Sequence, residues 1–422
     1  MGLLLSGGMV YSQKGKCFSQ NDIFIEGGII SKIAPHISSH FSKVFFLNNL
    51  YIIPGFVDVH VHLREPGFSY KETIRSGTRA AASAGYTAVC SMPNLNPPPD
   101  TPENLKIQTD IIERDALIGV FPYASITKGQ QGEGELADFA ALYDKVIGFS
   151  DDGRGVQSDA LMERAMAEAV KTNSIIAAHC EDNSLLNGGY IHDGRYAAEH
   201  SHKGICSASE YRQVERDLIL AKKTGCRYHI CHVSTKESVA LIKKAKSEGV
   251  KVTAETAPHY LLLCEDDLKE DGRFKMNPPL RGAEDRAALI EGIKDGTIDI
   301  IATDHAPHSA EEKAKGLAGS LMGVAGLETA FPVLYTNLVK KGVISTERLV
   351  ELMSINPRSI FGIGGGLGVG ESADIAVLDI NRQHRINAAE SLSMGKSSPF
   401  DGAEVYGKNK MTFYRGNMIW QD

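Results

Sequence analysis

The chain has few of the features that mark membrane, secreted or nucleic-acid-binding proteins. Its 422 residues contain no apolar stretch long enough to cross a membrane, and the start of the chain runs into Ser-Gly-Gly without a basic segment or a cleavage pattern. No cluster of lysine and arginine occurs, and the net charge is −7 from 45 basic and 52 acidic side chains, which disfavours binding to nucleic acid. These absences predict a cytoplasmic protein that binds neither a membrane nor a nucleic acid.

Cysteine is present, but not in the arrangements that build disulfide frameworks or thiolate metal sites. The seven cysteines are an odd number, irregularly spaced, with no Cys-x-x-Cys pair. We expect most of them to be small buried residues. Cys180 and Cys231 each stand next to a histidine, and alternation along a strand predicts that each points away from that histidine, into the packing behind the sheet.

The middle of the chain alternates short apolar strands with amphipathic helices. Hydrophobic residues make up 42% and charged residues 23%, as in ordinary globular proteins, and the length allows a large core. We expect strands at 51–59, 86–92, 117–123, 146–150, 174–178, 227–231, 251–255 and 298–303, and helices at 70–84, 102–116, 136–143, 159–171, 209–223, 236–247 and 284–294. Apolar strands joined by helical crossovers predict an α/β fold, a parallel (β/α)8 TIM barrel.

The two ends of the chain differ from this middle part. Residues 22–30 resemble a β-hairpin, residues 362–370 are rich in glycine, and further strands are expected at 374–378 and 411–415. We therefore expect residues 1–53 and 360–422 to form a small β-sandwich domain from both termini. The barrel would then comprise residues 54–359.

Histidine and aspartate stand where the predicted strands end. In His60-Val61-His62 the two histidines point to the same face of an extended strand and could grip one metal ion together. Later strand ends add Asp151 with Asp152, His179, His232 and Asp304. Each has an ordinary structural explanation when taken alone, as a cap, a turn or a core histidine. Because catalytic groups of such barrels gather at the carboxyl ends of the strands, their shared position predicts a metal site.

The ligand types favour zinc. Imidazole and carboxylate without thiolate suit Zn²⁺, and Mn²⁺, Co²⁺ or Fe²⁺ are also compatible with them. Six ligands are more than one catalytic zinc takes from protein, so two ions about 3.5–4 Å apart are favoured. Such a pair can bridge a hydroxide and polarise a carbonyl, which predicts hydrolysis or its reverse.

Short motifs extend this pattern over most of the chain. They are Asp58-Val-His-Val-His-Leu-Arg-Glu-Pro-Gly67, Met92-Pro-Asn94, Asp151-Asp-Gly153, Ala178-His-Cys-Glu-Asp182, Cys231-His-Val-Ser-Thr235, Glu255-Thr-Ala-Pro-His-Tyr260, Lys275-Met-Asn-Pro-Pro279 and Ala302-Thr-Asp-His-Ala-Pro-His308. Together they resemble the amidohydrolase superfamily, specifically the class I bacterial dihydroorotases. The resemblance implies a zinc-dependent hydrolase that interconverts N-carbamoyl-L-aspartate and L-dihydroorotate in de novo pyrimidine (UMP) biosynthesis.

The resemblance also implies roles for the candidate ligands. One zinc ion would be held by His60, His62 and Asp304, the other by His179 and His232, with Asp152 as the bridge. Strand alternation alone says only that Asp151 and Asp152 should not both face inwards. Many relatives use a carboxylated lysine as the bridge, but the nearest lysine here, Lys145, begins its strand. At about 3.3 Å per residue it lies roughly 23 Å from the site, which favours an aspartate bridge.

Substrate contacts are implied in the same way for Arg64, Asn94, Asn277, His308, Met322 and Gly323. A buried carboxylate requires paired donors, which Arg64, Asn94 and His308 could supply, while Asn277 would contact the ring amide. The family often has an aromatic residue where Met322 stands. Residues 309–323 are small, polar and glycine-rich, and form either a lid or a solvated loop.

The mechanism implied by the resemblance begins with a metal-bridged hydroxide that attacks the amide carbonyl of dihydroorotate. Asp304 accepts the hydroxide proton and delivers it to the departing nitrogen, and ring closure uses the same groups in reverse.

Two other functions remain open. The chain could be another cyclic amidohydrolase, such as a hydantoinase, dihydropyrimidinase or allantoinase, although Arg64, Asn94 and the aspartate bridge argue against this. It could also be a non-catalytic dihydroorotase-like partner of aspartate carbamoyltransferase, but every expected ligand is present. A homodimer, and association with that carbamoyltransferase, are further expectations from the family.

Overall fold

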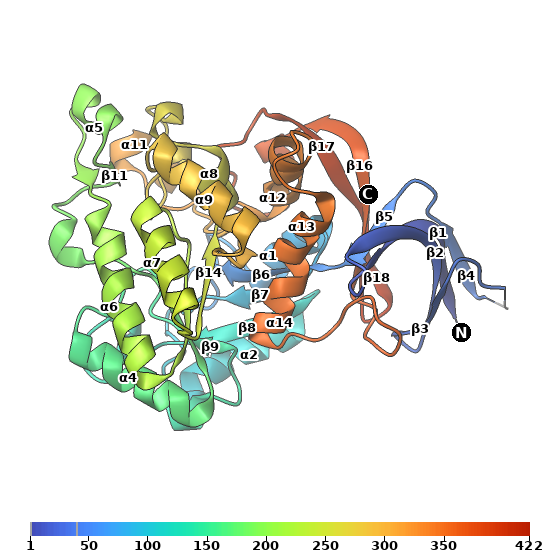
Figure 1. The fold of residues 1–422 in the computed structure, drawn as a ribbon, viewed down its shortest axis with the longest axis horizontal. Coiled ribbons are helices and arrows are strands. Elements are labelled where there is room, and N and C mark those ends of the chain that lie inside the picture. The colour runs from blue at the N-terminus through green and yellow to red at the C-terminus, as the bar shows by residue number, and fades with distance from the viewer. Residues whose placement is uncertain (1, 39–40) are drawn as a thin grey trace.

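The computed structural model describes residues 2–38 and 41–422 and contains a nearly closed barrel of parallel strands (Figure 1). In sheet order the strands are β6 (Phe56–Val61), β7 (Tyr86–Ser91), β8 (Gly119–Ala124), β9 (Gly148–Phe149), β10 (Ile175–Ala178), β13 (Arg227–Ile230), β14 (Val252–Thr256) and β15 (Ile300–Ile301). The two edges meet just beyond β15, where Val61 forms a parallel bridge with His305 and the His62 amide donates to the His305 carbonyl at 2.8 Å. The barrel is therefore sealed beside the predicted metal ligands.

Helices surround the barrel and connect its strands (Figure 1). The longer ones are α1 (Ile74–Ser83), α2 (Pro102–Asp115), α4 (Asp159–Thr172), α6 (Ala208–Thr224), α7 (Lys236–Ser247), α9 (Ala283–Asp295) and α12 (Leu327–Leu334). Several begin at a hydroxyl N-cap, as at Thr73 and Thr235, whose side chains accept from the amides of Ser76 and Ser238. No helix in the described part of the chain is long and apolar enough to cross a membrane.

Shorter helices lie mainly in the connections near the barrel mouth and towards the C-terminus. They are α3 (Phe139–Leu142), α5 (Arg195–His200), α8 (Pro258–Leu262), α10 (Ala310–Lys313), α11 (Gly316–Gly319), α13 (Thr346–Val350) and α14 (Asn356–Phe361), and the two-stranded sheet of β11 (Ile191–His192) and β12 (Gly204–Ile205) precedes α6.

Strands from both ends of the chain form a second sheet. It contains β1 (Leu3–Ser12), β2 (Cys17–Glu26), β3 (Ile29–Ala34), β4 (Lys43–Phe46), β5 (Tyr51–Pro54), β16 (Ile375–Arg385), β17 (Glu404–Tyr414) and β18 (Asn417–Gln421). Hydrogen bonds join them in the order β18-β17-β16-β5-β1-β2-β3, with β4 also paired to β1. In Figure 1 the blue and red strands of the two termini lie together beside the barrel. This hydrogen bonding describes one sheet, and the sandwich stays a prediction.

The predicted strand at 51–59 is two strands in the structure. Residues 51–54 pair with β1 and β16 in the terminal sheet, whereas Phe56 begins the barrel, and the break falls at Gly55. A Cβ on Gly55 would lie 2.2 Å from Cγ2 of Thr87, so no side chain fits there. A single apolar run cannot reveal this change of sheet, because both strands are buried.

The two cysteines that neighbour histidines differ from each other. Cys180 packs outside the barrel, as predicted, with Sγ 3.3 Å from the Tyr228 hydroxyl. The prediction for Cys231 is wrong: it belongs to the apolar cluster inside the barrel, and its Sγ lies within 4.8 Å of ligand atoms of His60 and Glu255. The reason is that β13 ends at Ile230 and His232 has a φ of 34°, so strict alternation no longer applies.

Candidate active site

A cavity of about 230 Å³ opens at the carboxyl ends of the barrel strands. Its lining comprises His62, Arg64, Asn94, Asp152, Gly153, His179, His232, Asn277, Asp304, Ala306, His308, Met322 and Gly323. Every predicted site residue except His60 is among them, and His60 lies fully buried next to the cavity. The structure thus brings together side chains spread over 264 positions of the sequence, from His60 to Gly323.

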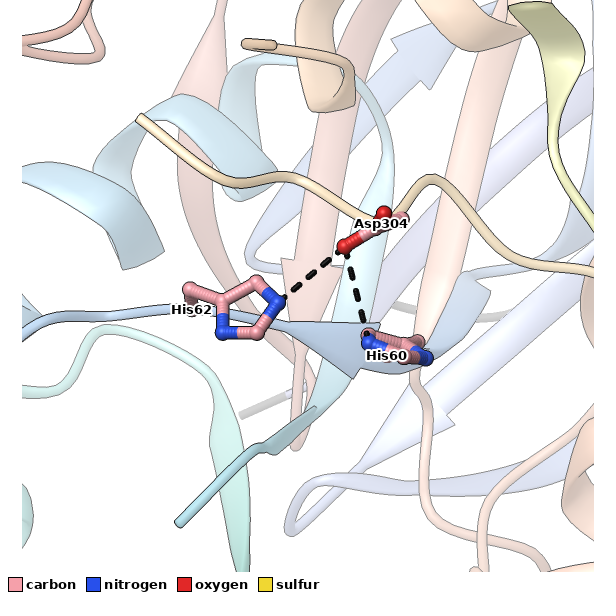
Figure 2. A group of neighbouring side chains, drawn as sticks. All are labelled: His60, His62 and Asp304. Atoms are coloured by element: carbon pink, nitrogen blue, oxygen red, sulfur yellow. Dashed lines mark hydrogen bonds and ion pairs between the residues drawn. The ribbon is translucent and has the colours of Figure 1, made fainter. Parts of the chain in front are cut away.

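Two groups of candidate metal ligands share the floor of this cavity. In the first, Oδ1 of Asp304 lies 3.1 Å from Nε2 of His62 and 3.5 Å from Nε2 of His60 (Figure 2). In the second, Nδ1 of His179 lies 2.9 Å from Nε2 of His232. The two groups are close enough for one carboxylate to reach both.

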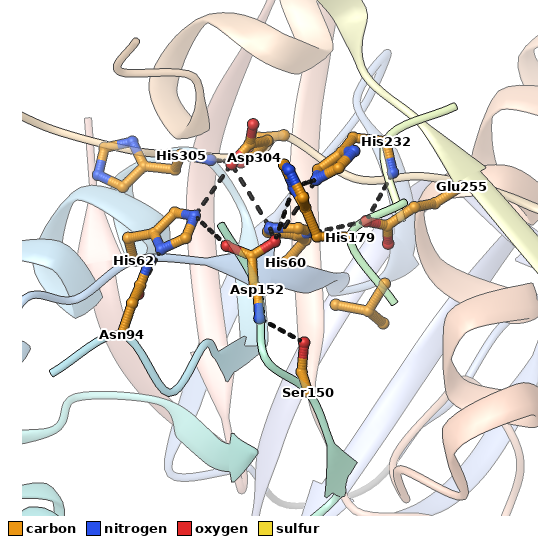
Figure 3. Close-up of polar contacts among 12 residues, drawn as sticks. His60, His62, Asn94, Ser150, Asp152, His179, His232, Glu255, Asp304 and His305 are labelled. Carbon is orange, nitrogen blue, oxygen red and sulfur yellow. Dashed lines mark hydrogen bonds and ion pairs between the residues drawn. The ribbon is translucent and has the colours of Figure 1, made fainter. Parts of the chain in front are cut away.

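Asp152 is that carboxylate. Its Oδ1 lies 3.4 Å from Nε2 of His232 and 3.7 Å from Nδ1 of His179, while its Oδ2 lies 3.6 Å from Nε2 of His62 (Figure 3). The neighbouring Asp151 points elsewhere and accepts hydrogen bonds from the backbone amides of residues 126 and 127. The structure therefore separates the two aspartates that sequence alternation left undecided.

The cluster has the properties of a cation site. Nε2 of His60 and Oδ1 of Asp152 are buried without a hydrogen-bond partner, which is costly unless another group satisfies them. Burial acts to raise the pKa of Asp152, but the charges and hydrogen bonds of His60, His232 and His62 together hold that pKa well below its usual range. Burial lowers the pKa of His62. Burial acts to lower the pKa of His60, but the charges of Asp152, Glu255 and Asp304 together raise it well above its ordinary value. Ionised carboxylates that favour a positive charge here, beside imidazoles that bind a metal in their neutral form, make a donor set that fits a cation.

Buried polar side chains orient the histidines from behind. Nδ1 of His60 lies 2.7 Å from Oε1 of Glu255, and Nδ1 of His62 lies 2.8 Å from Oδ1 of Asn94 (Figure 3). Nε2 of His179 lies 3.5 Å from Oε2 of Glu181. Such partners fix the tautomer and direction of a ligating imidazole.

Sequence reasoning assigned no role to two of these partners. Glu181 stands two residues after His179, so the alternation that links His60 to His62 could have suggested it. Glu255 comes from β14, which carries no candidate ligand, and no local spacing connects it to His60.

The opposite wall of the cavity carries positive charge. Arg64 has a φ of 62°, and its Nε donates to the Pro307 carbonyl at 3.2 Å. Burial lowers the pKa of Arg64 to about 10, which leaves the guanidinium charged at neutral pH. The Oδ1 of Asn94 faces His62, so the Nδ2 amide is free to face the cavity. This wall offers fixed donors to an anion.

His308 lies beside these donors and is itself held by hydrogen bonds. Its Nε2 donates to the Met322 carbonyl at 2.8 Å, and its Nδ1 lies 3.3 Å from Nζ of Lys71. Burial, followed by the charge of Arg64, lowers the pKa of His308 to about 3, so the ring is neutral near pH 7. Gly323 has a φ of 134°, and a Cβ there would lie 2.6 Å from the Ala306 carbonyl oxygen, so the backbone conformation requires glycine.

A parallel barrel with a histidine and carboxylate cluster at its carboxyl mouth defines the class of amidohydrolases. Within that class, a family model described as Dihydro-orotase-like matches residues 50–238. A dihydroorotase of Bacillus cytotoxicus is 47% identical over 100% of this chain and 99% of its own length, and one of Bacillus thuringiensis is similar to the same extent. The chain belongs to the dihydroorotase family.

Solved structures place the fold in the same superfamily. The L-hydantoinase (dihydropyrimidinase) from Arthrobacter aurescens has a TM-score of 0.90 and 27% identity, covering 99% of this chain and 96% of its own. The dihydropyrimidinase from Brevibacillus agri has a TM-score of 0.86 at 20% identity, covering 100% and 95%. The second likeness shows the fold alone.

Proposed function

We propose that this protein catalyses the reversible cyclisation of N-carbamoyl-L-aspartate to L-dihydroorotate, a step of de novo pyrimidine biosynthesis. The observation that carries the proposal is the donor wall of Arg64 and Asn94, with His308 beside it, which faces the candidate metal ligands across one cavity. Both compounds carry a carboxylate outside the reacting bond, and a buried guanidinium is the side chain best suited to bind it.

We further propose that the site holds two zinc ions in the class I arrangement. His60, His62 and Asp304 would hold one, His179 and His232 the other, with Asp152 between them. Bound zinc would polarise the ring carbonyl and activate water for attack. The buried unpartnered atoms of His60 and Asp152 support a cation at this place.

Asp304 would move the proton. Its Oδ1 faces His60 and His62, which leaves Oδ2 for the reacting groups. Burial acts to raise the pKa of Asp304, but His60, His62 and His232 together lower it, so the carboxylate is ionised and can accept a proton from water. As the carbon–nitrogen bond of the ring breaks, the same oxygen returns that proton to the nitrogen. Asn277, whose Nδ2 donates to Glu181 at 2.9 Å, has a free Oδ1 for the ring amide.

The experiment that tests this function measures bound metal and turnover together. Purified protein is assayed with dihydroorotate, hydantoin, dihydrouracil and allantoin, and its metal content is determined by mass spectrometry. We expect about two zinc ions per chain and turnover of dihydroorotate alone. Preferred turnover of hydantoin or dihydrouracil would favour the alternative represented by the Arthrobacter structure, and metal-free, inactive protein would favour a scaffolding role.

The cellular setting is also a proposal. All seven cysteines are free thiols, as expected in a reducing compartment such as the cytoplasm.

We propose a homodimer. In each chain, residues 54–359 would form the catalytic barrel, and residues 1–53 with 360–422 a separate β-sandwich domain. Light scattering of the protein alone, and again with aspartate carbamoyltransferase, tests the oligomeric state and that association.

A further inference from the structure

A buried lysine joins two loops that reach the cavity from different parts of the chain. Lys313 ends α10 and is 7% exposed. Its Nζ donates to three backbone carbonyls: Gly323 at 2.7 Å, Leu321 at 2.8 Å and Lys275 at 3.1 Å. Because an ammonium has three N–H donors, each donor has an acceptor. None of these three acceptors belongs to a side chain.

Further bonds hold the same two loops against each other. The Lys275 carbonyl also accepts from the Gly323 amide at 3.0 Å, and the Lys275 ammonium donates to the Ala318 carbonyl at 2.7 Å. The Ser320 hydroxyl donates to the Lys313 carbonyl at 2.9 Å. Lys313 lies at the centre of this contact, because its ammonium touches both loops at once.

The two joined loops carry predicted substrate contacts. Asn277 lies two residues after the Lys275 carbonyl, and Met322 lies between the two other carbonyls that bind Lys313. The Met322 carbonyl in turn accepts from His308. All three residues line the cavity, whereas Lys313 does not. A change at Lys313 would therefore reach the cavity through the backbone.

We propose that Lys313 is a positioning residue, which sets the distance between Asn277 and the Met322–Gly323 backbone and thereby the affinity for substrate. The inference rests on the proposed function for the identity of that substrate. No motif of the sequence indicates a role for Lys313. In this proposal Lys313 affects substrate binding rather than the bond that reacts.

The charge state of Lys313 makes the proposed effect on substrate affinity depend on pH. Burial, and then the charge of Lys275, lower the pKa of Lys313 to about 7, while Asp271 opposes the shift. The other titratable groups nearby are Glu312 on the same helix and His308, whose own pKa is about 3. Above pH 7 the neutral amine keeps two donors, and its lone pair cannot bond a carbonyl oxygen. One of the three bonds is then lost.

The test compares the metal-loaded Lys313→Met variant with Lys315→Met, which removes an exposed charge from the same loop. At pH 6 we expect Lys313→Met to raise KM for dihydroorotate about tenfold, from lost hydrogen bonds of a charged donor, with kcat changed by less than about threefold. Lys315→Met should match the natural protein. At pH 9 the KM ratio of Lys313→Met to the natural protein should fall below about threefold, because the natural protein has itself lost the ammonium.

Lys313→Arg keeps the charge and provides a second test if the methionine variant does not fold. A guanidinium does not titrate in this range, so we expect KM near that of the natural protein at pH 6 without its rise towards pH 9. A KM ratio that is constant with pH, a fall in kcat with KM unchanged, or equal effects of Lys313→Met and Lys315→Met would overturn the proposal.

Hydrogen exchange separates this inference from the proposed function. In the metal-loaded protein, Lys313→Met should speed exchange of amides in residues 272–280 and 316–326, including that of Gly323, while other regions keep their rates. This readout needs no turnover. If the natural protein does not act on dihydroorotate, the function fails while the exchange result still decides whether Lys313 joins the loops; unchanged exchange would refute the inference.

Discussion

The cavity has two sides that differ in construction. One, the ligand wall, carries the candidate metal ligands, and the other is the donor wall of Arg64 and Asn94. The ligand wall takes His60 from a barrel strand and places His62, His179 and His232 just beyond strand ends, and its polar atoms are partly unpartnered. The donor wall lies next to the loops of His308 and Gly323, and backbone carbonyls and lysines hold Arg64 and these loops in place. The ligand wall has buried polar atoms without hydrogen-bond partners, whereas the residues of the donor wall and their neighbours are bonded to one another. The ligand wall is suited to the reaction and the donor wall to binding the substrate. Single substitutions can test the two roles separately.

The largest effect is expected at Asp304, where the ligand wall would perform proton transfer. Asp304→Asn keeps an oxygen beside His60 and His62 but removes the base, so kcat should fall about 10³-fold. Steady-state kinetics with metal analysis would check this. Near-normal turnover at full metal content would remove Asp304 from the proton-transfer role.

The next effect tests the donor wall at Arg64. Arg64→Met should lower kcat/KM for dihydroorotate about 10²-fold, because it removes the charged partner of a buried carboxylate. Bound metal should stay unchanged. The matched control is Arg79→Met, which removes an exposed arginine from α1. Loss of metal in Arg64→Met, or an equal loss of activity in the control, would show that the two walls are not separable.

The ligand wall should also depend on the carboxylate behind it. Glu255→Gln is expected to weaken metal binding about 10- to 100-fold, since Glu255 fixes Nδ1 of His60. Metal loss in a chelator titration measures this, with the exposed Glu248→Gln as control. If both variants keep metal equally well, Glu255 has no part in holding His60 for the ion.

The smallest effect concerns Glu312, which accepts from Lys71 at 3.0 Å and from Tyr70 at 3.2 Å at the edge of the donor wall. Burial acts to raise the pKa of Glu312, but the bonds from Lys71 and from the Ser309 amide, with the charge of Lys71, together lower it to about 2. A depressed carboxylate pKa stabilises the fold above the ordinary value near 4.5, and this contribution is lost as the pH falls towards 2.

Glu312→Gln should therefore cost at most about 1 kcal/mol of unfolding free energy at pH 7, a value typical of partly exposed pairs. The difference from the natural protein should shrink as the pH falls from about 4.5 towards 2. Urea unfolding at several pH values measures both, with Glu311→Gln on the exposed side of α10 as control. A difference that grows as the pH falls would contradict this account.

Most residues of the ligand wall can be predicted from strand periodicity in the sequence. Those of the donor wall follow only from the resemblance to a known family. His60 and His62 follow from the two-residue period of a strand, and the later ligands follow from the common end of barrel strands. The choice of Asp152 over Asp151 did not follow from alternation, because it depends on the amides of residues 126 and 127, which bind Asp151. The contacts of Lys71 and Glu255, and the bond from Lys313 to the Lys275 carbonyl, join residues that are distant in sequence, so no local pattern could predict them.

The join between the two sheets has a consequence for the order in which the protein can form. β5 needs β16, which begins at Ile375, and the seam beside His62 needs His305. A nascent chain therefore contains His60 and His62 long before Asp304, the last of the proposed ligands, has been made. The seam of the barrel cannot close until residue 305 has been made, and the inner edge of the terminal sheet cannot close until β16 follows. A metal ion that bound His60 and His62 before Asp304 was made would therefore meet an incomplete set of ligands.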